Sequence, residues 1–237
     1  MLIDMRNGLM AGGKLSARSY VQDGLVAMWD GIENAGWGVH DQNATMWKDL
    51  VGNVDILLYH TSVLDDGFAF RLDGANTGYG SASFPTNYGC IEVVLNKASI
   101  PAPARYAGCC IITIGSAYSG WGICDSFGRV SDTNDNASAP YVVIPYDQRC
   151  YIALNKAANS VLTEAIAKNG ILSSDGTLAA GARYNNGQQS INTPNSETRS
   201  SNLDLCAIRL YSRALTAAEI AANYAVDKAR FNLSGAT

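Results

Sequence analysis

Residues 204–224 read Asp204-Leu-Cys-Ala-Ile-Arg-Leu-Tyr-Ser-Arg-Ala-Leu-Thr-Ala-Ala-Glu-Ile-Ala-Ala-Asn-Tyr224. In the first half of this stretch, Ala207, Arg209 and Tyr211 alternate with Ile208 and Leu210. Because successive residues of a strand face opposite sides, this period of two predicts a strand with at least one buried face.

The second half of the stretch predicts a helix over residues 216–230. Thr216 and Glu219 have the spacing of a capping box, in which the Thr216 hydroxyl accepts from the Glu219 N–H and the Glu219 carboxylate accepts from the Thr216 N–H. Ile220, Tyr224 and Phe231 fall on one side of that helix and predict its buried face.

Short apolar runs separated by Gly-centred turns fill most of the remaining chain. This pattern predicts an all-β fold: a two-sheet antiparallel jelly-roll sandwich with one short C-terminal helix. Long surface loops are expected at 131–139 and 187–202. Strands are expected at 55–59, 67–72, 80–84, 89–96, 108–115, 120–127, 139–145, 149–155, 160–168, 178–184 and 206–212.

Four further stretches carry a resemblance to a known family. They are Asp23-Gly-Leu-Val-Ala-Met-Trp-Asp30, Trp47-Lys-Asp-Leu-Val-Gly-Asn53, Phe70-Arg-Leu-Asp-Gly74 and Cys90-Ile-Glu-Val-Val-Leu95. Together with the closing strand and helix, they resemble laminin-G-like, concanavalin A-like jelly-roll domains of the kind found in bacteriophage and gut-bacterial surface proteins. The resemblance implies that Trp29 and Tyr211 lie in the core. It implies little about function, since this fold hosts lectins, adhesion modules, glycanases and structural domains.

The composition suits one large globular domain of 237 residues with a formal net charge of −4. No Lys/Arg cluster occurs, so nucleic acid is not an expected partner. No apolar run approaches the roughly 20 residues of a membrane-spanning helix, and the first residues lack the pattern of a secretory signal. The six cysteines have no zinc-site spacing and are expected to be buried free thiols: Cys90, Cys109, Cys110, Cys124, Cys150 and Cys206.

The chain is predicted to consist of an N-terminal arm, residues 1–19, and a jelly-roll domain, residues 20–237. The arm has scattered apolar side chains without a convincing partner in the sandwich: Leu2, Ile3, Met5, Leu9, Met10 and Leu15. Ordering such a segment alone costs roughly 1–2 kcal/mol per residue. We therefore expect the arm to pack on other protein chains of an assembly; the alternative is that it folds back on its own domain.

Catalytic carboxylates are not evident in the sequence. Glycanases of the resembled fold carry Glu-x-Asp-x-x-Glu on one strand, which places several carboxylates on the same face. Here Glu92 has Val94 and Asn96 at its same-face positions, and Glu164 is also without a carboxylate two residues away. The chain is therefore predicted not to be an enzyme.

Two motifs offer oxygen ligands for calcium, the one candidate cofactor. The first comprises Asp132, Asn134 and Asp135 within Asp132-Thr-Asn-Asp-Asn136, and the second comprises Asp30, Asp41 and Asn43. The alternative is that these residues make turns and cap backbone groups. Otherwise no cofactor is expected.

Two further motifs combine aromatic and amide side chains, as sugar-binding loops do. Tyr118-Ser-Gly-Trp121 supplies Tyr118 and Trp121, and Tyr184-Asn-Asn-Gly187 supplies Tyr184, Asn185 and Asn186. Alternatively, Trp121 begins a core strand and the Asn-Gly pair makes a hairpin turn. Trp29, Trp37 and Trp47 are expected in the core or packing a loop.

The leading interpretation is a non-enzymatic structural or adhesion protein on the surface of a bacteriophage virion, as a capsid decoration, fibre or tail-associated protein, with cell-surface glycans as candidate ligands. It follows from the family resemblance and from the absence of an evident export signal. The alternative is a secreted carbohydrate-binding module at a bacterial surface or outside the cell. A glycoside hydrolase is the least favoured.

Overall fold

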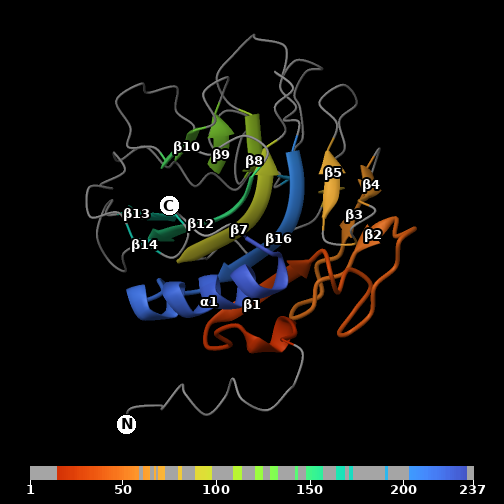
Figure 1. Cartoon of the computed structure of the whole chain (residues 1–237), viewed down its shortest axis with the longest axis horizontal. Coiled ribbons are helices and arrows are strands. Elements are labelled where there is room, and N and C mark those ends of the chain that lie inside the picture. The colour runs from red at the N-terminus through yellow and green to blue at the C-terminus, as the bar shows by residue number, and fades with distance from the viewer. Residues whose placement is uncertain are drawn as a thin grey trace.

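Two antiparallel β-sheets form a sandwich in the computed structural model, and helix α1 (Ala217–Arg230) lies across one face of the larger sheet (Figure 1). The all-β sandwich with one short C-terminal helix expected from the sequence is thus confirmed. The structure describes residues 15–58, 61–64, 67, 69–72, 80–81, 89–97, 109–113, 121–124, 129–132, 142–143, 148–156, 164–168, 171–172, 190–191 and 203–233.

The larger sheet has the strand order β14-β13-β12-β7-β16-β5-β4, and β1 pairs with β16 beside β5. The smaller sheet has the order β11-β10-β9-β8-β15-β6, and β2 pairs with β3 in a separate ribbon. The strands are β1 (Leu25–Asp30), β2 (Met46–Trp47), β3 (Ile56–Leu57), β4 (Thr61–Val63), β5 (Phe70–Leu72), β6 (Gly80–Ser81), β7 (Cys90–Lys97), β8 (Cys109–Thr113), β9 (Trp121–Cys124), β10 (Arg129–Asp132), β11 (Val142–Val143), β12 (Arg149–Lys156), β13 (Glu164–Lys168), β14 (Ile171–Leu172), β15 (Ser190–Ile191) and β16 (Leu203–Tyr211).

The centre of the larger sheet is buried on both faces. Along β7, Ile91, Val93 and Leu95 belong to one hydrophobic cluster, the first core, while Cys90 and Val94 belong to a second. This second cluster lies under α1 and is called the helix-side core. It includes Tyr151, Tyr211, Ile220 and Phe231. The expected burial of Trp29 and Tyr211 is confirmed, since neither side chain is exposed.

Helix α1 begins at the predicted capping box. Glu219 N donates to Thr216 Oγ1 at 3.3 Å, and Thr216 N donates to Glu219 Oε2 at 2.8 Å. Ile220 and Phe231 are fully buried and Tyr224 is half-buried, as their common helix face predicted. The helix has 14 residues, and within the part of the chain that the structure describes no helix is long and apolar enough to span a membrane.

Several short strands differ from the sequence-based expectation. β2, β4, β10, β14 and β15 were not predicted. β10 extends into the stretch expected to be a loop at 131–139, and β15 lies within the one expected at 187–202. These strands have two to four residues, too few to show a periodic pattern. The strand expected at 178–184 lies outside the described residues. Cys90, Cys150 and Cys206 are buried and form no disulfide, as expected, and the other three cysteine side chains lie outside the described set.

The last residues of the predicted N-terminal arm pack on the domain itself. Residues Ala17–Ser19 form a 3₁₀ helix, η1, capped by Ser16. Ala17 is fully buried, and its N–H donates to Glu33 Oε1 at 2.7 Å. Residues 1–14 lie outside the described residues, so the arm's contacts with other chains stay a prediction.

Candidate functional site

Two predicted site residues, one for a sugar and one for calcium, lie together at one end of the β9–β10 pair. Trp121 begins β9, Asp132 ends β10, and the two residues are partners across the pair. One sugar-binding candidate and one calcium-ligand candidate, predicted from separate motifs, therefore share one end of this strand pair. The other sugar candidates, and the other candidates of the first calcium motif, lie outside the described residues: Tyr118, Tyr184, Asn185 and Asn186 for a sugar, and Asn134 and Asp135 for a metal.

The second calcium set expected from the sequence is not assembled. Asp30 is fully buried and accepts from Arg230 Nη1 at 2.6 Å. Asp41 is exposed, and its Oδ1 accepts from the Asn43 N–H at 2.9 Å, which is the turn-making alternative. Within the described residues, no group of three or more His, Cys, Asp or Glu side chains lies together in a way that could hold a metal ion.

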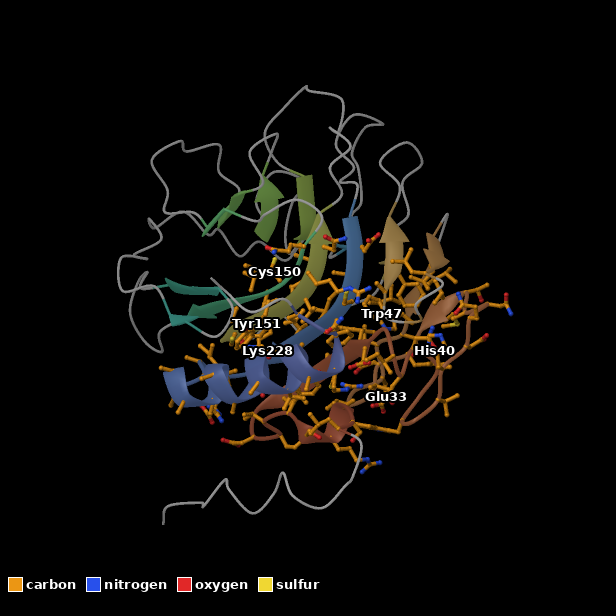
Figure 2. All side chains as sticks on the ribbon, in the orientation of Figure 1. Glu33, His40, Trp47, Cys150, Tyr151 and Lys228 are labelled. Carbon is orange, nitrogen blue, oxygen red and sulfur yellow. The ribbon has the colours of Figure 1, made fainter. Side chains whose placement is uncertain are left out.

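A cluster of charged side chains lies buried between α1 and the larger sheet. Figure 2 shows side chains filling this space, with Tyr151 on the sheet next to the helix. We call the cluster the buried ion-pair cluster. Its charged members are Asp30, Glu33, Glu92, Arg209, Asp227 and Arg230.

Glu92 sits at the centre of this cluster. It is the partner of Arg209 in the β7–β16 register, and Arg209 Nε donates to Glu92 Oε2 at 2.6 Å. The Tyr151 hydroxyl donates to Glu92 Oε1, and Asn223 Nδ2 of α1 lies 3.0 Å from both oxygens. Both oxygens of this fully buried carboxylate therefore already accept hydrogen bonds from the protein.

Arg209 also holds α1 onto the sheet. Its Nη1 donates to Asp227 Oδ1 at 2.9 Å, and its Nη2 donates to Asp227 Oδ2, so the pair is bidentate. The Tyr20 hydroxyl donates to Asp227 Oδ1 at 2.7 Å, and the Arg209 guanidinium lies 4.0 Å from the Tyr20 ring centroid. The segment just after η1, the strand β16 and the helix are thereby joined at one guanidinium.

Arg230 makes the second junction, at the last residue of α1. Its Nη1 donates to Asp30 Oδ2 at 2.6 Å, and its Nη2 donates to Glu33 Oε1 at 2.8 Å. Asp30 also accepts from the N–H groups of Ile32 and Glu33 at 2.9 and 3.1 Å. The end of the helix is therefore tied to the end of β1 and to the loop that follows.

The cluster contains four carboxylates and two guanidinium groups, so its buried acids outnumber its bases. Burial disfavours the charged form of an acid and raises the pKa of Asp30 and Asp227 despite their arginine partners. Burial likewise raises the pKa of the Tyr20 and Tyr151 hydroxyls. For Arg209, burial acts to lower the pKa, but the nearby carboxylates of Asp227 and Glu92 outweigh it.

The chemistry of this cluster is structural. The four carboxylates are at most 5% exposed, and each accepts hydrogen bonds from neighbouring protein groups. A general acid or base must reach the proton it transfers in a bound substrate, and α1 covers the face of the sheet that carries Glu92. The sequence shows one signal for the cluster, an arginine between the apolar residues Ile208 and Leu210, but it does not show the partners of that arginine.

Comparisons with known proteins find similarity in structure. No family model and no curated protein matches the chain. Among solved structures, the sialidase of Trypanosoma rangeli aligns with a TM-score of 0.57 and 14% identity over 86% of this chain and 33% of that one. The same sialidase in complex with sialic acid aligns over 92% of this chain, with the same TM-score and identity.

A second kind of protein shares the architecture. The binding domain of botulinum neurotoxin serotype D aligns with a TM-score of 0.58 and 12% identity, over 86% of this chain and 52% of that one. The present chain spans about a third of the length of the sialidases it matches. At these identities the likeness shows the fold alone, a β-sandwich that is also found in a toxin binding domain and within a sialidase.

Proposed function

We propose that this chain is a non-enzymatic binding and adhesion module of the laminin-G-like, concanavalin A-like type. The observation that carries the proposal is the burial of Glu92, Asp30, Glu33 and Asp227, the four carboxylates of the buried ion-pair cluster. A sandwich whose central acids are covered by a helix suits recognition at loops and edges more than hydrolysis on the sheet face.

The structural neighbours support a carbohydrate as the ligand. One is the binding domain of a neurotoxin, and another is a sialidase in complex with sialic acid. In this chain, the loops next to Trp121 and Asp132, at one end of the β9–β10 pair, are the proposed glycan contacts. Calcium held by Asp132, Asn134 and Asp135 would offer further coordination positions there, which sugar hydroxyls would occupy as ligands.

The proposed setting is the surface of a bacteriophage virion, where residues 1–14 attach the module to other chains. The secreted bacterial carbohydrate-binding module is the alternative. Light scattering distinguishes them, because a virion component forms a multimer that is lost when residues 1–14 are deleted. Deletion should end there, because Ala17 is buried in the domain. A full-length protein that is monomeric and absent from purified particles would contradict the virion setting.

A glycan screen with the full chain tests the binding function. We expect retention on some immobilised glycans and no release of reducing ends from the same glycans. Trp121→Ala should lose retention on glycans bound at the β9–β10 end, with Met46→Ala as a control at an exposed apolar residue of β2. Reducing-end release that disappears in Glu92→Gln would instead show catalysis and overturn the proposal.

A further inference from the structure

An exposed arginine lies over a tryptophan ring next to the buried ion-pair cluster. The guanidinium carbon of Arg18, in η1, is 4.5 Å from the centroid of the Trp37 ring. Trp37 lies in the loop after β1 and packs with its buried part against the helix-side core. We call these two residues the Arg18–Trp37 pair.

Arg18 differs from the other arginines whose side chains the structure describes. Arg209, Arg213 and Arg230 form ion pairs with carboxylates, and Arg149 donates to the Phe231 carbonyl. Among the described residues, Arg18 contacts the Trp37 ring and pairs with no carboxylate. A guanidinium that contacts an aromatic ring through its face has N–H groups at its edge that can donate to a carboxylate in a planar, bidentate geometry.

The loop beside the Trp37 ring has room for a ligand. Gly36 and Gly38 flank the tryptophan with φ angles of 138° and 71°, a backbone conformation that favours glycine. A Cβ atom built on either glycine would meet no other atom within 4 Å. The next residue, Val39, is 51% exposed. The residues on either side of Trp37 in the chain thus carry no side chain, and the space that their side chains would occupy is open.

A single buried carboxylate holds both halves of this arrangement. Glu33 Oε1 accepts from the N–H of Ala17, the residue before Arg18, at 2.7 Å. Glu33 Oε2 accepts from the N–H of Gly38, the residue after Trp37, also at 2.7 Å.

Glu33 is 5% exposed and its Oε1 also accepts from Arg230. Figure 2 shows Glu33 on the side of the molecule where α1 and the loop after β1 lie. Binding groups supported in this way are pre-organised, which lowers the cost of ordering them.

We propose that the Arg18–Trp37 pair binds a carboxylate-bearing sugar, such as the acidic end of a surface glycan. The guanidinium edge donates two hydrogen bonds to the carboxylate, and the sugar ring lies beside Trp37 in the space left by Gly36 and Gly38. The open space and the aromatic ring favour a sugar acid over a small free anion. This inference rests on the proposed binding function but concerns a different part of the molecule from the β9–β10 end.

Nuclear magnetic resonance titration of the full chain tests the proposal. The probes are the methyl glycosides of N-acetylneuraminic acid and of galactose, and sodium acetate. The indole N–H signal of Trp37 is assigned by its loss in Trp37→Phe. We expect this signal to shift with the acidic sugar and to stay in place with galactose and with acetate at equal concentration.

Two variants complete the test. Arg18→Gln should weaken binding of the acidic sugar by about tenfold or more, since it removes the positively charged guanidinium that donates to the carboxylate. Lys228→Gln removes an exposed positive charge from α1 and should leave binding unchanged. Because Arg18 is exposed, its variant is expected to fold, and an unchanged melting temperature confirms this.

Each alternative outcome has a distinct meaning. Unchanged affinity in Arg18→Gln, with binding of glycans elsewhere on the protein, overturns this inference and leaves the proposed function standing. An equal shift with galactose overturns the assignment to a sugar acid, and an equal shift with acetate reduces the site to a simple anion contact. Absence of glycan binding by the unmodified protein overturns both proposals.

Discussion

Arg209 is fully buried and forms ion pairs with two carboxylates, Glu92 and Asp227. Forming such a buried pair is not necessarily favourable, because both charges lose their hydration. Breaking it is costly, because the remaining charge stays buried without compensation. The consequence of a substitution therefore depends on which partner is left behind.

We expect Arg209→Met to lower the free energy of unfolding by about 3–5 kcal/mol, since it leaves Glu92 and Asp227 without their shared guanidinium. The matched control is Arg213→Met. Arg213 pairs with Glu219 and Asp23 at the surface, where an ion pair contributes about 0–1 kcal/mol. Urea unfolding of both variants measures the difference. Equal losses in the two variants would contradict the structural role of the cluster.

Trp29 is fully buried in the first core, and its Nε1 donates to the Val54 carbonyl at 2.8 Å. Trp29→Ala should cost about 3–5 kcal/mol, the usual range for deleting a large buried aromatic side chain. Met46→Ala, at a residue that is 39% exposed, serves as the control and should cost far less. A Trp29→Ala protein with unchanged melting would mean that this ring is not part of the core.

Asp49 shows how a short motif can be structural. Its Oδ1 accepts from the N–H groups of Met28, Val51 and Gly52, all at 3.0 Å, and its Oδ2 accepts from Val54 N at 3.2 Å. The Asp49 carboxylate thereby accepts from the Met28 N–H of β1, which leaves that group unavailable for pairing with a further strand. The resemblance in Trp47–Asn53 thus reflects the fold of this turn.

At the scale of elements, α1 depends on its first turn. The capping box satisfies N–H groups that an isolated helix end would leave without partners. We expect Thr216→Ala to lower the free energy of unfolding by about 1 kcal/mol, within a range of roughly 0.5–2 kcal/mol. Thr216→Ser keeps the hydroxyl and should be close to neutral. Thermal unfolding measures both, and a Ser variant as unstable as the Ala variant would argue against the cap.

The sequence is informative about long elements with local signals. The period of two in β16 and the capping box of α1 lie within one stretch, so both could be predicted from neighbouring residues. Strands such as β2 and β14 have two residues each and exist because a partner strand supplies their hydrogen bonds. No local pattern marks them, so they could not be predicted.

The contacts within the candidate sites could not be predicted, because they join residues that are far apart in the chain. Glu92 and Arg209 are 117 positions apart in the chain, and Arg230 and Asp30 are 200 apart. Their pairing follows from strand order and from where α1 lies, neither of which is encoded in a short motif. Arg18 falls in the predicted arm, and Trp37 in a stretch expected to pack a loop. Only the folded chain, through Glu33, brings these two residues together.

At the scale of the whole molecule, the segment before β1 is hydrogen-bonded to β16 and α1 at the other end of the described domain. Val21 N donates to Asn223 Oδ1 at 2.9 Å, and the Tyr211 hydroxyl donates to the Val21 carbonyl at 3.1 Å. With the contacts of Tyr20 and Arg230, these bonds close the domain around α1. The buried ion-pair cluster lies in this junction, so its protonation affects the stability of the entire fold.

The signs of the pKa shifts determine how stability depends on pH. Burial raises the pKa of Asp30 and Asp227 above the value of about 4 in an unfolded chain. The folded state therefore binds protons more tightly, and this contribution is complete below about pH 4 and is lost as the pH rises through the folded pKa values. Glu219 acts in the opposite sense, because hydrogen bonds from Arg213 lower its pKa to about 2.

We therefore expect the free energy of unfolding to increase as the pH falls toward about 4 through the folded pKa values of Asp30 and Asp227, and to decrease below about 4 as Glu219 is protonated. Urea unfolding across this range measures the profile. Asp227→Asn, with no titrating group at this position, should reduce the increase to the contribution of Asp30, whereas Glu219→Gln should flatten only the decrease in strong acid. If the unmodified protein instead loses stability steadily from about pH 7 downward, Asp30 and Asp227 stay charged, and Arg209 and Arg230 outweigh the effect of burial.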